Sequence, residues 1–327
     1  MEEIKFSAGI WAFTSCADRF VTEGYRKSLS LKEQIKLACQ VKGLDGLILQ
    51  FPTVVNRENV EEVKRLLREG ELEVSAVDAN LFGSQFPVGA FTSGDERIRR
   101  KAIEIAMGAV DMTQQLDCSY AGLWLGQDGF DYPFQANYSH LWDREIEAIR
   151  QVANHNPEVK ICIEYKLKEP RMHLTIGSVG KALLICEKIA KDNVGVTLDF
   201  GHAMLGKENP AESATLLARY NRLFSTHFND CYRETDDDLI AGSVHSWELL
   251  ELLFVLQQVR YKGWYGLDIF PYRENIVKAC QYSIQNIKSL LKALEKIDIP
   301  SLAEAQKTMS YIEIHRIIRE ALYPLSE

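Results

Sequence analysis

The chain has 327 residues, of which 46% are hydrophobic and 26% charged, with a formal net charge of -8 at pH 7. This composition excludes a disordered chain, a collagen-like repeat and a small disulfide-stapled protein. The acidic balance disfavours nucleic-acid binding, because Lys and Arg at the phosphates supply most of that affinity. No run of about 18 apolar residues is present that could cross a bilayer.

The seven cysteines form an odd set without a C-x-x-C pair, which is typical of reduced thiols. The first residues, MEEIKFSAGIW, lead directly into a strand-like segment and show no signal-peptide pattern. We therefore expect a cytoplasmic protein.

Short β-branched or apolar runs alternate along the chain with longer amphipathic stretches. Strands are predicted at residues 5–11, 45–51, 72–82, 120–126, 159–166, 194–202, 223–230 and 264–270. Helices, with apolar residues at i, i+3, i+4 and i+7, are predicted at residues 30–41, 59–70, 95–116, 141–154, 178–191, 211–221, 246–259 and 274–297. Such alternation favours a parallel sheet with helical crossovers.

Eight such units favour closure into one (β/α)8 TIM barrel, with a doubly wound open sheet as the alternative. We assign residues 1–298 to this catalytic barrel domain. Residues 299–327 predict one or two further helices, a C-terminal helical extension. This extension either packs on its own barrel or forms an oligomerisation arm that holds another subunit.

Active sites of such barrels lie at the carboxyl ends of the strands. Acidic and imidazole side chains gather at the ends of the last four predicted strands. They are Glu164, Asp199, His202, His227, Asp236, Asp238 and Asp268, accompanied by Lys166. Carboxylates that are forced together repel one another unless some protonate or a cation lies among them. Oxygen-rich ligands with one or two histidines suit Mn²⁺, Mg²⁺ or Co²⁺.

The charges of this group indicate how many cations it takes. Its members include five acids and one lysine, if neighbouring Glu234, Asp230 and Asp237 are left out. Two divalent cations bring the total to zero, whereas one leaves it negative. The sequence therefore favours two metal ions.

The order and spacing of these residues resemble the xylose isomerase-like barrel superfamily, and within it most closely L-rhamnose isomerase and related sugar isomerases. That pattern is a Glu-x-Lys, an Asp-x-x-His, a single His, an Asp-x-Asp and a final Asp. The corresponding residues here are Glu164 and Lys166, Asp199 and His202, His227, Asp236 and Asp238, and Asp268. The resemblance covers roughly residues 5–275.

The resemblance implies an isomerase that interconverts an aldose and a ketose between C1 and C2. It assigns a first metal to Glu164, Asp199, His227 and Asp268, and a second to His202, Asp236 and Asp238. Lys166, His202 and Asp268 are the implied catalytic residues, with Lys166 at the reacting oxygen. The implied cofactors are two divalent cations, with Mn²⁺ placed first and Mg²⁺ or Co²⁺ as alternatives, and no organic cofactor.

Further polar and aromatic residues near the strand ends suit a monosaccharide, since aromatic faces pack against C–H groups and polar side chains bind hydroxyls. As substrate-binding residues we predict Trp11, Phe13, Asn80, Trp124, Asp128 and Lys166. The alternative for the aromatics is packing within the barrel. Asp78 and Asn80 are candidates for assisting ring opening.

Two other functions remain open at this stage. A single-metal ketose 3-epimerase uses the same barrel, but would leave Lys166 and the Asp236–Asp238 loop without a role. A non-catalytic sugar-binding protein is the alternative outside enzymes. A trinuclear zinc endonuclease is disfavoured by the acidic charge and the seven histidines of the whole chain. Because related isomerases are commonly dimers or tetramers, we expect a homo-oligomer.

Overall fold

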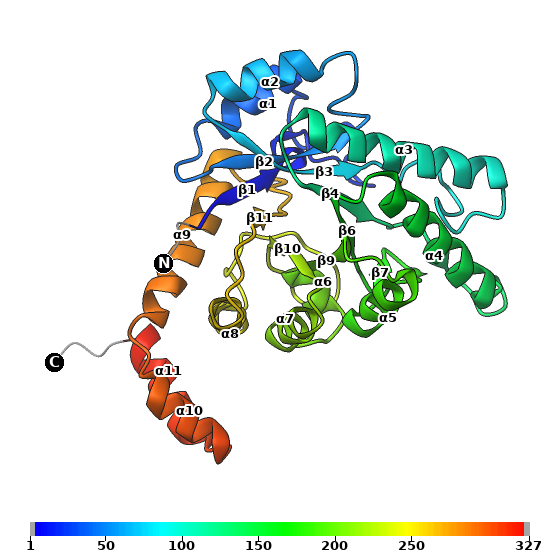
Figure 1. Cartoon of the computed structure of the whole chain (residues 1–327). Coiled ribbons are helices and arrows are strands. Elements are labelled where there is room, and N and C mark those ends of the chain that lie inside the picture. The colour runs from blue at the N-terminus through cyan, green and yellow to red at the C-terminus, as the bar shows by residue number, and fades with distance from the viewer. Residues whose placement is uncertain (1–3, 324–327) are drawn as a thin grey trace.

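A computed structural model describes residues 4–323 and shows eight parallel strands closed into a barrel (Figure 1). The strands are β1 (Phe6–Gly9), β2 (Gly46–Phe51), β3 (Glu73–Ala79), β4 (Tyr120–Trp124), β6 (Lys160–Glu164), β9 (Val194–Asp199), β10 (Leu223–Phe228) and β11 (Tyr265–Leu267). They neighbour one another in chain order, and β11 pairs with β1 to close the ring. The predicted (β/α)8 barrel is confirmed and the open-sheet alternative is wrong. Residues 1–3 and 324–327, at the outer ends of the two predicted domains, lie outside the described residues.

Helices surround this barrel on its outside (Figure 1). They are α1 (Leu31–Ala38), α2 (Val60–Glu69), α3 (Glu96–Gln115), α4 (Tyr138–His155), α5 (Val179–Ile189), α7 (Pro210–Arg219), α8 (Ser246–Gln258) and α9 (Ile276–Leu294). Polar residues determine where several of these helices begin. At such a position a side-chain oxygen accepts a hydrogen bond from a backbone N–H that has no partner inside the helix. Ser30 and Glu33 form a full capping box, and Ser178 and Asn275 cap α5 and α9.

The strands are apolar on both faces because one face packs on helices and the other fills the barrel. All six residues of β9 are buried, and the first five, Val194 to Leu198, are small, apolar or hydroxylated. Asp199 is the charged residue at its carboxyl end. The apolar run thus positions the strand, and its end carries the first carboxylate of the barrel mouth.

Seven of the eight barrel strands end two or three residues earlier than the sequence predicts, and at two of them a short helix follows at once. After Gly9 the chain turns into a short 3-10 helix, η1 (Ile10–Phe13), which carries Trp11 and Phe13. After Asp199 it enters the short helix α6 (Phe200–Leu205). The Asp199 carboxylate accepts a hydrogen bond from the backbone N–H of His202 at 2.7 Å, so it caps α6 and stops the strand.

A small antiparallel sheet lies outside the barrel and was not predicted. It pairs β5 (Gly129–Phe130) with β8 (Met172–Leu174), and β8 with β7 (Lys168–Glu169). Buried Asp128 holds the loops around it together. Its carboxylate accepts from the backbone N–H and the hydroxyl of Thr92, each at 2.6 Å, and its carbonyl accepts from the Thr175 N–H at 3.0 Å. One residue therefore joins the loops that follow β3, β4 and β6.

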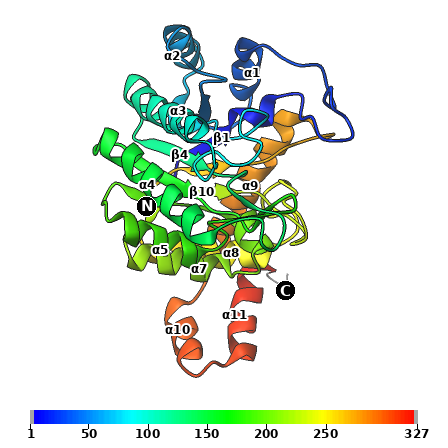
Figure 2. The same cartoon turned by 90° about the vertical axis from the view of Figure 1, so that its right-hand side faces the viewer.

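The C-terminal extension is a hairpin of α10 (Ile299–Lys307) and α11 (Tyr311–Leu322) that projects away from the barrel (Figures 1 and 2). It packs on its own chain, where the His315 ring stacks on Trp247 of α8 with centroids 5.2 Å apart. Met309 and Ile312 at its tip remain 86% and 79% exposed. A role for this hairpin as an oligomerisation arm stays a prediction.

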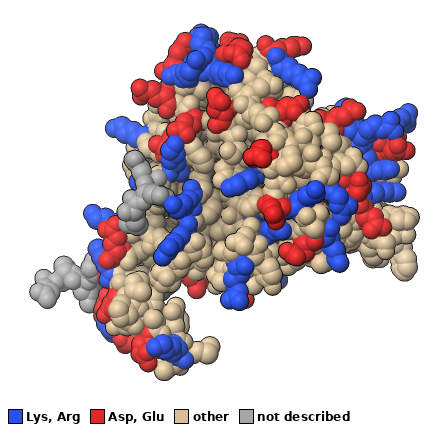
Figure 3. Space-filling model, in the orientation of Figure 1, with Lys and Arg blue, Asp and Glu red and all other residues tan. Residues whose placement is uncertain are grey.

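The surface carries charges of both signs. On the face in Figure 3, lysines and arginines are interspersed with aspartates and glutamates. Among residues 4–323, no helix combines the length and the apolar character needed to cross a membrane.

Glu145 on α4 generates a prediction about pH and stability. Its side chain is fully buried, and neither carboxylate oxygen has a hydrogen-bond partner among the described residues. Burial, and then the nearby charge of Asp128, raise the pKa of Glu145 well above its usual value. Ionisation is therefore easier in the unfolded chain, and raising the pH above about 4.3 destabilises the fold until the pKa of the folded state is passed.

We compare the melting temperature of Glu145→Gln with that of the natural chain. The difference should shift in favour of Glu145→Gln by about 2 °C or more as the pH rises from about 5 to 8. Calorimetric melting at a series of pH values measures the difference. Exposed Glu147 on the same helix supplies the control variant Glu147→Gln, for which no such trend is expected. A difference for Glu145→Gln that does not depend on pH would contradict the prediction.

Candidate active site

Four side chains converge at the carboxyl end of the barrel. They are Glu164 at the end of β6, Asp199 at the end of β9, His227 on β10 and Asp268 just after β11. Each offers one ligand atom, and these atoms all lie within 4.8 Å of one another. The strand register brings them to one level, since Asp199 pairs directly with His227 across β9 and β10. We call this group the four-ligand cluster.

Neighbouring groups orient each member of the four-ligand cluster. His227 Nδ1 lies 3.2 Å from Glu164 Oε1 and 3.5 Å from Asp268 Oδ2. The Trp11 indole N–H donates to Asp268 Oδ1 at 2.6 Å, and Asn229 donates to Asp199 Oδ2 at 3.0 Å. These contacts hold the side chains of the four-ligand cluster close to one another.

Burial and neighbouring charges shift the pKa values of two members of the four-ligand cluster. Burial raises the pKa of Asp199 to about 7, and the charge of Glu164 adds to this effect while that of His202 opposes it. Burial alone would lower the pKa of His227, but the charge of Glu164 and the hydrogen bond to Asp268 raise it well above its ordinary value. A bound cation would replace the protons that these groups retain.

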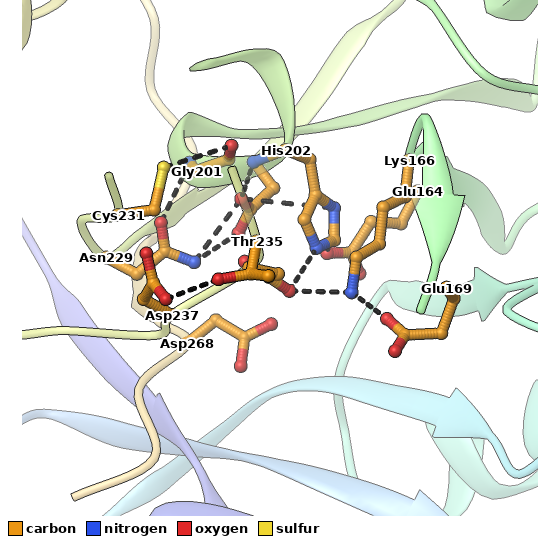
Figure 4. Close-up of polar contacts among 12 residues, drawn as sticks. Glu164, Lys166, Glu169, Gly201, His202, Asn229, Cys231, Thr235, Asp237 and Asp268 are labelled. Atoms are coloured by element: carbon orange, nitrogen blue, oxygen red, sulfur yellow. Dashed lines mark hydrogen bonds and ion pairs between the residues drawn. The ribbon is translucent and has the colours of Figure 1, made fainter. Parts of the chain in front are cut away.

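A second set of side chains lies beside the four-ligand cluster (Figure 4). Asp236 Oδ2 lies 2.7 Å from Lys166 Nζ and 3.1 Å from His202 Nε2. Lys166 also forms an ion pair with Glu169, so its ammonium lies between two carboxylates. Burial alone would lower the pKa of Lys166, but Asp236 and Glu169 raise it above its usual value. Lys166 is therefore a buried, charged ammonium.

Both sets fit divalent cations. The four-ligand cluster combines three carboxylates with an imidazole, the donor types that Mn²⁺, Mg²⁺ and Co²⁺ share. In the second set, Asp236 Oδ1 is buried without a hydrogen-bond partner among the described residues. His202 Nδ1 lies 3.1 Å from the carbonyl of Tyr165, which directs Nε2 toward Asp236. The Asp238 carboxyl joins them, and burial followed by the charge of Asp236 raises its pKa well above the usual value.

Both sets open into one cavity of about 360 Å³. It is lined by Trp11, Gln50, Asp78, Ala79, Phe82, Trp124, Glu164, Lys166, Glu169, His202, Asp236, Asp238, Asp268, Phe270 and Tyr272. Its lining combines ionic side chains with the aromatic rings of Trp11, Phe82, Trp124, Phe270 and Tyr272. This size and this mixture suit a small polar ligand with C–H faces.

The structure brings Trp11, Trp124 and Lys166 to this cavity but places three other predicted substrate-binding residues elsewhere. Phe13 is fully buried in the hydrophobic core, because the 3-10 turn directs it inward. Asn80 donates to the Thr53 hydroxyl at 3.2 Å, and Asp128 accepts from Thr92 beneath the loops. We therefore revise the prediction that Phe13, Asn80 and Asp128 contact substrate.

Asp78, named from the sequence only as a ring-opening candidate, does face the cavity. It pairs in register with Gln50 on one side and Gly122 on the other. A Cβ atom at Gly122 would lie 2.0 Å from Asp78 Oδ1, so the missing side chain makes room for the carboxyl. Burial raises the pKa of Asp78 to about 7.

Other lining residues were missed altogether. Gln50 lies near the end of β2, a signal that could have placed it. Glu169 lies on the small sheet and Phe270 and Tyr272 follow β11 in an irregular segment, so their positions depend on contacts that the local sequence does not encode.

The loop after β10 presents alternate acids to the cavity. Asp237 Oδ2 accepts from the Tyr232 N–H at 2.7 Å, and its Oδ1 accepts from the Thr235 hydroxyl at 2.6 Å. Asp237 thereby ties the loop to itself, while Asp236 and Asp238 line the cavity. Asp230, also set aside in the charge count, is buried and accepts hydrogen bonds from the backbone N–H groups of Val244 and His245.

The model of the xylose isomerase-like TIM barrel family matches residues 41–297. The chain belongs to this family. The resemblance found in the sequence is thus confirmed at the level of the family and its fold.

Curated relatives within the family carry isomerase names. A probable sugar isomerase from Mesorhizobium japonicum is 26% identical over 205 residues, which is 60% of this chain and 47% of that protein. The xylose isomerase of Thermus thermophilus is 26% identical over 211 residues, or 62% of this chain and 54% of that protein. The chain spans about half the length of these relatives.

Solved structures with the same fold include several epimerases. The D-allulose 3-epimerase from Methylomonas sp. gives a TM-score of 0.69 at 16% identity over 88% of this chain and 97% of that one. An L-ribulose 3-epimerase gives 0.69 at 13% identity over 90% and 97% of the two chains. At these identities the likeness concerns the fold alone.

Metal binding should stabilise this chain. A cation that binds only the folded state stabilises it by about 2.7 kcal/mol at a hundred times its dissociation constant. We expect the melting temperature to rise with Mn²⁺ concentration after removal of metal with EDTA. Asp268→Asn, which removes one charge of the four-ligand cluster, should lose most of this rise.

Asp237→Asn is the matched control for Asp268→Asn. Asp237 lies directly between the proposed ligands Asp236 and Asp238, yet its carboxylate accepts hydrogen bonds from its own loop. It should retain the Mn²⁺ response. Identical melting curves of the natural chain in EDTA and in Mn²⁺ would count against a metal site.

Proposed function

We propose that this chain is a metal-dependent sugar isomerase that interconverts an aldose and a ketose at C1 and C2 with two divalent cations, Mn²⁺ in first place. The observation that carries the proposal is the position of Lys166. Its ammonium lies in the cavity, 2.7 Å from Asp236 and beside the four-ligand cluster. A fixed positive charge next to two sets of metal-ligand side chains suits a reaction that develops negative charge on a substrate oxygen.

In this proposal, two sets of residues bind the cations and Lys166 binds the substrate. Glu164, Asp199, His227 and Asp268 would hold one cation, and His202, Asp236 and Asp238 the other. When bound, such cations act as Lewis acids toward substrate oxygens and lower the pKa of water. Lys166 remains protonated and donates a hydrogen bond to the reacting oxygen.

The surrounding residues keep this arrangement in place. Trp11 holds Asp268 through its indole N–H, and the Tyr165 carbonyl fixes the ring of His202. Trp11, Trp124 and Phe82 present apolar surface to the sugar, which limits the access of water to the reacting carbons.

A single-metal ketose 3-epimerase is the second candidate. The observation in its favour is that the four-ligand cluster forms a complete site by itself, with two carboxylates, Glu164 and Asp268, next to the cavity. The 3-epimerases among the solved structures share the fold. In this alternative, the buried Lys166–Asp236 pair has no part in the chemistry.

Product identity separates these functions. Protein stripped with EDTA is supplied with Mn²⁺, Mg²⁺ or Co²⁺ and incubated with a panel of aldoses and ketoses. We expect conversion between aldose and ketose, and two bound ions per chain by elemental analysis under saturating Mn²⁺. A ketose epimeric at C3 would support the second candidate, and binding without turnover would support a sugar-binding protein.

Lys166→Met tests the role of the ammonium. If Lys166 stabilises the oxyanion, this variant should lose kcat by about 10²-fold or more while it still binds metal. Lys168→Met is a matched control, because Lys168 is two residues away on β7 and does not line the cavity. Near-normal kcat in folded, metal-loaded Lys166→Met protein would remove the main support for isomerisation.

We propose further that the substrate is a monosaccharide or contains one, and that the chain forms a homo-oligomer, dimer or tetramer. The exposed apolar tip of the α10–α11 hairpin supports the second point. All seven cysteines are free thiols, which supports a reducing, cytoplasmic location. Neither a nucleic acid nor a membrane is proposed as a partner.

A further inference from the structure

A second hollow adjoins the cavity of the candidate active site. Its volume is about 430 Å³, and it shares Phe82, Trp124 and Glu169 with that cavity. Beyond these three residues it is lined by the polar side chains of Gln127, Asp131 and Arg171, together with Gly83, Gly126, Pro170 and Met172. We call this hollow the outer groove. Pockets for small molecules commonly measure about 300–1,000 Å³. The two hollows together reach the upper part of this range, which is more space than a single sugar ring fills.

Contacts between separate loops build the outer groove. Gln127 Oε1 accepts from the backbone N–H of Gly83 at 2.5 Å, which joins the loops after β4 and β3. Arg171, in the turn between β7 and β8, lies with Nε 3.3 Å from Asp131 Oδ1 and its guanidinium 5.7 Å from the centre of the Tyr132 ring. Gly83 is exposed, and a Cβ atom there would meet nothing within 4 Å.

The lining indicates the chemistry of an occupant. Phe82 and Trp124 stand edge to face, with centroids 5.1 Å apart, at the junction of the two hollows. Gln127, Asp131 and Arg171 supply hydrogen-bond donors and acceptors beyond them. Aromatic rings followed by such groups suit a hydroxylated ring.

The charges that line the outer groove are paired. Arg171 lies 3.3 Å from Asp131, and Glu169 forms an ion pair with Lys166 of the cavity. Because the positive charge of Arg171 is already bound by a carboxylate, the outer groove suits a neutral polyhydroxyl group better than a phosphate or carboxylate.

We propose that the outer groove binds a neutral glycosyl substituent on the sugar whose carbonyl end occupies the cavity. The substrate is then a reducing disaccharide. This inference rests on the proposed function only in placing the reacting sugar beside the four-ligand cluster.

Glucosyl-fructose disaccharides linked through O4, O5 or O6 of fructose are suitable probes. Calorimetry on Mn²⁺-loaded protein compares their dissociation constants with that of fructose. Because every probe carries the same ketose, a poor fit of fructose affects all of them equally. We expect at least one linkage to bind at least about tenfold more tightly than fructose, a difference of about 1.4 kcal/mol.

Arg171→Ala should reduce this preference for the disaccharide several-fold, and Met172→Trp, which fills the outer groove, should do the same. Arg57→Ala is the matched control. Its guanidinium lies 3.4 Å from Asp111 and its side chain is 74% exposed, close to the 3.3 Å and 72% of Arg171 with Asp131. The control should retain the full preference.

Three results would overturn the inference: no linkage binding more tightly than fructose, a preference unchanged in both groove variants, or fructose 6-phosphate binding more tightly than every disaccharide. All three leave the isomerase proposal intact, because they do not concern turnover. Conversely, tight disaccharide binding without turnover of any sugar would reject the isomerase and retain the outer groove.

Discussion

Repulsion between carboxylates in a buried space is the constraint on which the rest of this structure depends. Two unit charges 4 Å apart interact by about 4 kcal/mol at an effective dielectric constant of 20. Glu164, Asp199 and Asp268 share a space in which their ligand atoms lie within 4.8 Å. The protein withstands this by surrounding them with donors such as Trp11 and Asn229, and by leaving room for positive charge.

The barrel produces this concentration of charge through its topology. Parallel strands all end at the same rim, so each polar residue that stops an apolar run adds to the same site. Asp199 does this while it also caps α6, which places His202 one helical turn away and within reach of Asp236. Lys166, two residues after the end of β6, faces the same rim and is held between Asp236 and Glu169. Local folding signals and the site are thus carried by the same few residues.

Much of this was predictable because it is encoded locally. Apolar runs bounded by polar residues gave the eight barrel strands, and their ends gave the members of the four-ligand cluster and Lys166. Residues outside the regular strands were not predictable in this way. Phe13 turns into the core because a 3-10 helix replaces the end of a strand, and Asn80 and Asp128 bind distant loops. Glu169 depends on a sheet whose strands of two or three residues are too short to show a periodic signal.

The bonds around Asp128 have a consequence for how such a site can change. Its carboxylate and carbonyl join the loops after β3, β4 and β6, and these loops and the strand ends before them carry Phe82, Trp124 and Glu169. Those three residues form the boundary shared by the cavity and the outer groove. Asp128 therefore holds the three parts of this boundary together. Replacing one of these loops with that of a relative would break its hydrogen bonds with Asp128. A new substrate preference therefore requires exchanging the three loops together, or changing side chains on them while Asp128 is kept.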